Sequence, residues 1–190
     1  MYRSPILGVS VLATMLGGTA AVASPAKHSG GDVFVLSQSG VLSRHDATLR
    51  LIPKSSKRIT GVTKGDQLIG LDTRPATGGL YALSRSGQLY RTDVKTAAAT
   101  AVGTPIAPQG SAVGFDFNPT VDRIRVVTDT GQNLRLHPDT GAVADTDTPL
   151  SYPATSRSPK VTASGYTNSV AGATSTALYG LDSAQDTLVK

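Results

Sequence analysis

Residues 114–141 read GFDFNPTVDRIRVVTDTGQNLRLHPDTG, and residues 70–97 read GLDTRPATGGLYALSRSGQLYRTDVKTA. The two segments align without a gap at an offset of 44 residues. Gly, Asp, Pro, Gly and Gln recur at matching places, and an apolar run follows each Pro. A period of about 40 to 50 residues made of short strands and turns is typical of a β-propeller blade.

The same unit continues more faintly on both sides of this pair. Leu36–Gly40 repeats Leu83–Gly87 at an offset of 47, and Leu178–Asp182 resembles Leu80–Ser84. The stretch between the third and fourth units is polar and rich in Pro, which favours an inserted loop. The repeat domain is expected over residues 32–190, with units near 32–65, 66–107, 108–144 and 161–190 and a loop over 145–160.

Each unit is expected to hold up to four short antiparallel strands. In the third unit the pattern predicts strands over 112–117, 123–128 and 132–136, and a fourth that begins at 142–144. Pro, Asn, Asp and Gly stand at the turns between them. The predicted fold is therefore all-β, a β-propeller-like array of four-stranded antiparallel blades. A solenoid or a β-sandwich is the alternative, although a sandwich does not explain the repeat.

The ends of the repeat array do not complete a ring in this prediction. No clear first strand precedes Val33, and the last residues, Thr187–Lys190, fall within a third strand. The array is thus expected to hold about three and a half blades and to be incomplete. Open sheet edges favour pairing, so the chain is predicted to be a truncated form of a longer protein or to self-associate through those edges.

The N-terminus has the pattern of a secretory signal peptide. Arg3 precedes an apolar stretch, and Ala21-Val22-Ala23 resembles a cleavage site. We expect a signal peptide over 1–23, a flexible segment over 24–31, and no membrane span after cleavage. The protein is then secreted and extracellular, or periplasmic if the source has an outer membrane.

Composition excludes several function classes. The chain of 190 residues has no Cys, and its 13 acidic residues are all Asp. These facts exclude disulfides, Cys-ligated metals and motifs that need Glu. The formal net charge is +5, but the basic residues are scattered, so no nucleic-acid partner is predicted. A cell-wall polymer, which is anionic, or another protein is the expected kind of partner.

The motifs resemble a bacterial family classed as a domain of unknown function, numbered 4394. The resemblance is carried mainly by Gly114–Gly141, with support from Ile69–Gly78 and Tyr166–Asn168. It covers about residues 32–190, and it implies an exported, propeller-like repeat protein without an established activity.

Repeated polar residues at strand ends are the candidate ligand-binding positions. Asp72 and Arg74 match Asp116 and Asn118, each just before a Pro turn. The favoured interpretation is structural, with the Asp carboxylate accepting backbone N–H groups of the turn. The functional alternative is that these groups line one face of the ring and bind a ligand.

Arg123 and Arg125 complete the candidate ligand-binding set. Their alternation predicts that they share one strand face, where they could pair with Asp116 or Asp129 or bind an anionic ligand. The three His residues, His28, His45 and His137, are expected apart from one another, the last two at the surface. No catalytic residue, metal ligand or cofactor is predicted.

Two kinds of function fit these observations. The first is a secreted, non-enzymatic module that binds a partner at the cell surface or in the medium. The second is a metal-dependent propeller enzyme of the lactonase or lyase type, in which Asp72, Asp116 and Asn118 would join an axial set of ligands. A remnant without an independent function is the third interpretation.

Overall fold

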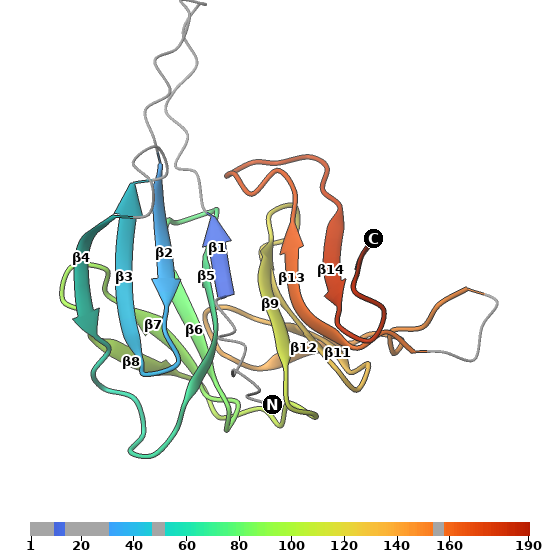
Figure 1. Cartoon of the computed structure of the whole chain (residues 1–190), viewed down its shortest axis with the longest axis horizontal. Coiled ribbons are helices and arrows are strands. Elements are labelled where there is room, and N and C mark those ends of the chain that lie inside the picture. The colour runs from blue at the N-terminus through green and yellow to red at the C-terminus, as the bar shows by residue number, and fades with distance from the viewer. Residues whose placement is uncertain (1–9, 14–30, 47–51, 154–157) are drawn as a thin grey trace, which may run out of the picture.

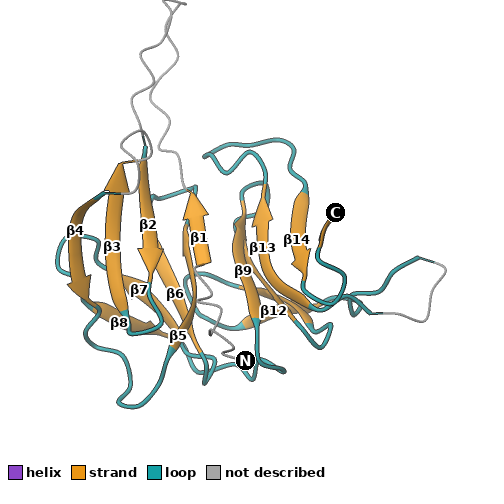
Figure 2. Ribbon diagram, in the orientation of Figure 1, coloured by secondary structure: helices purple, strands orange, loops and turns teal. Residues whose placement is uncertain are grey.

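The computed structural model describes residues 10–13, 31–46, 52–153 and 158–190, and for 10–13 it describes the backbone alone. The described residues form strands, turns and loops without a helix (Figure 2). The strands make four antiparallel sheets in sequence order, of four, four, four and three strands. The chain is therefore an all-β, propeller-like array, and we call the sheets blades 1 to 4.

The strands of each blade follow one another in the chain. Those of blades 1 and 2 are β1 Ser10–Ala13, β2 Asp32–Leu36, β3 Val41–Asp46, β4 Pro53–Arg58, β5 Leu68–Thr73, β6 Leu80–Ser84, β7 Leu89–Thr92 and β8 Ala99–Val102. Those of blades 3 and 4 are β9 Val113–Asn118, β10 Arg123–Thr128, β11 Asn133–Leu136, β12 Val143–Thr146, β13 Val161–Tyr166, β14 Leu178–Asp182 and β15 Thr187–Val189. The strands predicted for the third unit are confirmed to within about two residues.

The first strand of each blade lies on the inside of the array. β1, β5, β9 and β13 occupy the centre of Figure 1, with β4 at the outer edge of blade 1. Contacts between blades run through these inner strands, with β5 beside β1 and β9, and β9 beside β13. This arrangement brings the four inner strands around a common axis.

Blade 1 has an innermost strand that the sequence analysis did not expect. Ser10–Ala13 pairs antiparallel with Val33–Leu36, which makes blade 1 four-stranded. The strand was not expected because these residues have the composition of a signal peptide. The pairing leaves the predicted signal peptide untested, since it describes the chain before any cleavage.

Apolar side chains join blade 1 to blade 2 and blade 2 to blade 3. We call the side of a blade that faces the following blade its forward face, and the other side its backward face. On the forward face of blade 2, Tyr81, Leu83 and Leu89 are at most 3% exposed. They pack on the backward face of blade 3, where Phe117 and Ile124 are fully buried. The rings of Tyr81 and Phe117 meet edge to face at 5.2 Å.

Two repeated Gly residues let the inner strands approach closely. A Cβ at Gly70 would lie 2.7 Å from the Cβ of Phe115, and one at Gly114 would lie 2.5 Å from the Oγ of Ser164. Both positions therefore exclude any side chain. This steric requirement explains why Gly recurs two residues before each repeated Asp.

Blade 4 departs from the pattern in its packing. A cavity of about 150 Å³ remains between Val127 of blade 3 and the backward face of blade 4, near Leu178 and Val189. The segment after β12 is bound to blade 4 through Asp182, which accepts a hydrogen bond from the hydroxyl of Tyr152 at 2.5 Å.

The described residues contain no helix that could span a membrane.

Candidate functional site

The repeated Asp residues connect one blade to the next. The Oδ2 atom of Asp72 accepts a hydrogen bond from the backbone N–H of Phe117 at 2.6 Å. The Oδ2 atom of Asp116 accepts one from the backbone N–H of Tyr166, also at 2.6 Å. In addition, Asp72 accepts the N–H of Thr73 through its other oxygen. These bonds give both carboxylates a structural part between blades, whereas the bond to Thr73 lies within β5 and not in the Pro turn, where it was expected.

Asp72 and Asp116 also contact each other. Their residues are 1% and 3% exposed, and a side-chain hydrogen bond links them. Burial is the main cause that raises the pKa of Asp72 well above its ordinary value, and the Asp116 carboxyl adds to it. Burial likewise raises the pKa of Asp116. Two ionised carboxylates would repel each other in this buried position, which agrees with the raised pKa of both groups.

Arg74 makes a second connection between blades 2 and 3. Its Nε and Nη2 atoms donate to both oxygens of Asp122 at 2.8 and 2.5 Å, and its Nη1 atom donates to Asp139 at 2.5 Å. The Arg74 side chain is 11% exposed. Asn118, which aligns with Arg74, instead accepts the backbone N–H of Thr120 and so fixes its own turn.

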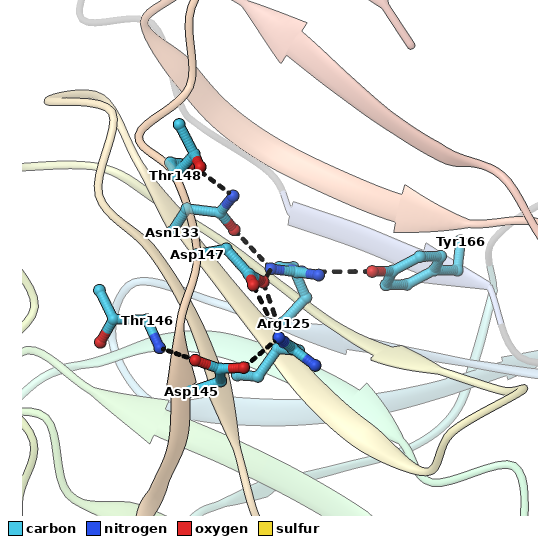
Figure 3. A network of polar contacts seen from close by, with 8 residues as sticks. Arg125, Asn133, Asp145, Thr146, Asp147, Thr148 and Tyr166 are labelled. Carbon is cyan, nitrogen blue, oxygen red and sulfur yellow. Dashed lines mark hydrogen bonds and ion pairs between the residues drawn. The ribbon is translucent and has the colours of Figure 1, made fainter.

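Arg125 lies in a polar network between blades 3 and 4 (Figure 3). It donates to Asp147, to Asn133 at 2.6 Å and to the hydroxyl of Tyr166 at 3.2 Å. Asp147 also binds Arg135, which stands directly opposite Arg125 in the sheet. The expected pairing of Arg125 with Asp116 or Asp129 is thus wrong, because the chain beyond β12 returns and brings Asp147 to the guanidinium.

Arg123 shares a strand face with Arg125 by alternation along β10, but it has a different partner. Its Nη1 atom donates to the backbone carbonyl of Asp122 at 2.9 Å. The six predicted positions therefore lie near one end of β5, β9 and β10, but their polar atoms bind other parts of the chain. The structure brings Asp72 to Asp116 and Arg74 to Asp122 and Asp139, and it directs Arg125 to Asp147.

The two described His residues, His45 and His137, lie on different blades. His45 is buried at 9% exposure, so its expected surface position is wrong, whereas His137 is half-buried and accepts the N–H of Asp139. His28 lies outside the described residues. Within the described part of the chain, no group of three His or Asp side chains is placed to hold a metal ion.

A cavity of about 210 Å³ lies at the other end of the inner strands. All four blades line it, through the β2–β3 turn, the beginning of β5 and β9, and Thr162 of β13. The polar side chains in its wall are Ser37, Gln38, Gln67, Arg85, Ser111 and Thr162. We call this cavity the axial cavity.

The axial cavity combines one positive charge with neutral donors and acceptors. Arg85 is exposed and donates to the backbone carbonyl of Ser111 at 3.1 Å, which orients its guanidinium. The described residues in the wall include no carboxylate. Amides, hydroxyls and a guanidinium are suited to a sugar, a carboxylate or a phosphate group.

The sequence analysis missed the axial cavity. One signal that points to it is the repeated turn Leu36–Gly40 and Leu83–Gly87, because turns that recur with the blade period come to the same end of the array. Ser37, Gln38 and Arg85 all lie in those turns. The other lining residues follow no motif, so only the folded arrangement identifies them.

A family model described as "Domain of unknown function (DUF4394)" matches residues 42–190. No curated protein matches the sequence. Several solved structures have a similar fold. They include the WD40 domain of Toxoplasma gondii coronin (12% identity, 71% of this chain, 33% of that chain, TM-score 0.47), a chain of the mitotic checkpoint complex (15%, 85%, 47%, 0.45) and BamB from Moraxella catarrhalis (14%, 85%, 49%, 0.44). The chain thus spans between a third and a half of these proteins.

Proposed function

The chain belongs to the family described as domain of unknown function DUF4394, and we propose that it is an exported, non-enzymatic module that binds an anionic extracellular polymer at the axial cavity. The observation that carries this proposal is the convergence of all four blades on one cavity with a polar wall. A site made by several elements of a rigid scaffold is the usual form of a ligand site.

The charge and size of the axial cavity define the kind of ligand. Arg85 provides a guanidinium beside neutral amides, so the cavity favours a single negative group surrounded by hydroxyls. About 210 Å³ is small for a whole ligand, so one repeat of a polymer would enter it. The formal net charge of +5 strengthens the attraction to a polyanion.

Binding to defined polymers tests the proposal. The probes are polyglycerol phosphate and polygalacturonate, with neutral dextran as the reference, and binding is measured by titration calorimetry on the protein purified from the culture medium or periplasm. Arg85→Gln is expected to weaken binding of the anionic probes about tenfold or more. Arg91→Gln is the matched control, since Arg91 is exposed on β7 outside the cavity wall. Equal binding by both variants, or no binding of either polyanion by the wild type, would contradict the proposal.

Export and metal content are tested separately. Mass spectrometry of protein from the culture medium or periplasm is expected to give an N-terminus after Ala23, as the pattern at Ala21–Ala23 predicts. An intact N-terminus on a protein retained in the cells would contradict export. Elemental analysis of the same material distinguishes the enzyme alternative, for which about one equivalent of bound metal per chain is expected.

A further inference from the structure

The forward face of blade 4 carries two exposed Leu side chains. Leu181 is 51% exposed and Leu188 is 65% exposed. They stand opposite each other on β14 and β15 and therefore share one face of the sheet. Tyr179 lies on the same face two residues before Leu181, by strand alternation.

The corresponding residues of blades 1 and 2 are buried by the following blade. The register places Leu36 opposite Leu42 in blade 1 and Leu83 opposite Leu89 in blade 2, as it places Leu181 opposite Leu188. The first four are 8%, 4%, 0% and 1% exposed. In both cases the covering surface is the backward face of the next blade.

The aromatic position of this face repeats too. Phe34, Tyr81 and Tyr179 each stand two residues before the first Leu of the pair. Phe34 and Tyr81 are 8% and 3% exposed and belong to the cores that join blades 1 to 2 and 2 to 3. Blade 4 thus presents the same aromatic and aliphatic surface that binds a blade elsewhere in the chain.

Blade 1 is the first of the four described sheets in chain order, so no described sheet precedes its backward face. Its backward face includes Val35 and Val41, both half-buried, and Val33 and His45, which are 8% and 9% exposed in the single chain. We propose that the forward face of blade 4 binds the backward face of blade 1 in a second copy of this chain. The contact would reproduce the interface that already joins consecutive blades.

Two such contacts can close a ring. If blade 4 of each copy packs against blade 1 of the other copy, the two copies of four sheets together form a ring of eight sheets. This number lies within the range of about 4 to 8 blades found in closed propellers. A head-to-tail contact that does not close would instead produce open chains, so the proposal is specifically a closed dimer.

Light scattering coupled to size-exclusion chromatography of the full chain gives the first test. The expected mass is twice the 19.5 kDa of one chain. Leu188→Asp is expected to give the monomer, whereas Val121→Asp is expected to remain dimeric because Val121 is 52% exposed in a turn of blade 3. A monomeric wild type, a dimeric Leu188→Asp, or a series of larger assemblies would overturn the proposal.

Chemical cross-linking provides a test that does not depend on a disruptive variant. The chain has no Cys, so Leu181→Cys and Val41→Cys variants each carry a single thiol. A flexible bismaleimide is expected to link the two variants when they are mixed, and to link neither with itself. Self-linking of Leu181→Cys would show face-to-face pairing of blade 4, and no linking in the mixture would show that the faces do not meet; either result overturns the proposal.

Discussion

The carboxylate of Asp72 accepts a hydrogen bond at 2.6 Å from the backbone N–H of Phe117, which lies on the inner strand of the next blade. Asp116 repeats this relationship with Tyr166 one blade further along. The repeated Asp therefore binds blade to blade near the axis of the array. This interpretation gives the repeat a physical purpose that does not require a ligand.

The inter-blade bond predicts a difference between two substitutions of Asp72. Asp72→Ala leaves the N–H of Phe117 buried without its acceptor, so the free energy of unfolding should fall by about 2 to 4 kcal/mol. Asp72→Asn keeps one acceptor oxygen for the N–H of Phe117 but turns its NH2 group toward the N–H of Thr73, so it should lose less than Asp72→Ala, about 1 to 2 kcal/mol. Urea denaturation of both variants measures this difference. Equal losses of unfolding free energy in the two variants would show that the side-chain oxygen that accepts the N–H of Phe117 does not stabilise the fold.

The same pair predicts how stability depends on pH. Burial raises the pKa of Asp72 in the folded state above its unfolded value, so the folded protein holds a proton that the unfolded chain releases. The contribution of the Asp72 carboxyl to the free energy of unfolding is therefore present at low pH. It is lost as the pH rises from the unfolded pKa of this group towards its raised folded pKa.

Asp72→Asn cannot release this proton, and it provides the comparison. The stability of the variant relative to the wild type should increase as the pH rises from about 4 into the neutral range, because the wild type has two buried carboxyls to ionise and the variant keeps only Asp116. Chemical denaturation across this range measures the relative stability. A constant difference between the two proteins would contradict a pKa raised by burial.

The Arg74 connection predicts a loss of stability without a role in ligand binding. The Arg74 side chain is 11% exposed and binds both oxygens of Asp122. Arg74→Ala should lower the free energy of unfolding by about 3 kcal/mol, since it leaves a partly buried carboxylate unpaired. Arg74→Lys should recover part of the loss but not the two-oxygen geometry. Arg91→Ala, at an exposed position, should change stability by less than about 0.5 kcal/mol and serves as the control.

Repeats made the architecture predictable from the sequence, because chance does not reproduce a 44-residue pattern of turns and apolar runs. The positions of Asp72 and Asp116 at strand ends followed from that pattern. Their partners did not, since the N–H groups of Phe117 and Tyr166 belong to other units and any backbone can provide them. Arg125 illustrates the same limit, because Asp147 reaches it only through the return of the chain beyond β12.

The axial cavity and the bare face of blade 4 were outside the reach of sequence analysis for different reasons. Gln67, Ser111 and Thr162 come together only when the inner strands surround the axis. Leu181 and Leu188 fit the repeat as ordinary core residues, and only their exposure in the folded chain distinguishes them. A periodic pattern identifies what a residue can bury against, but not whether that partner is present.

Two Gly residues at one repeated turn position should differ sharply in their tolerance of a side chain. Gly40 and Gly87 both have left-handed backbone, with φ of 76° and 88°. A Cβ at Gly40 meets nothing within 4 Å, but one at Gly87 would lie 1.8 Å from the carbonyl oxygen of Ile106. Gly40→Ala should therefore cost only the strain of left-handed backbone, about 1 to 2 kcal/mol.

Gly87→Ala has to displace the backbone at Ile106, whose N–H is bonded to the Gly87 carbonyl at 3.0 Å. Its cost should exceed that of Gly40→Ala by about 2 kcal/mol or more, because the clash and the loss of this bond add to the strain. Thermal and urea unfolding of the two variants, measured side by side, give the comparison. If the two substitutions cost the same, the approach of the 104–108 segment to the β6–β7 turn is not part of the folded structure in solution.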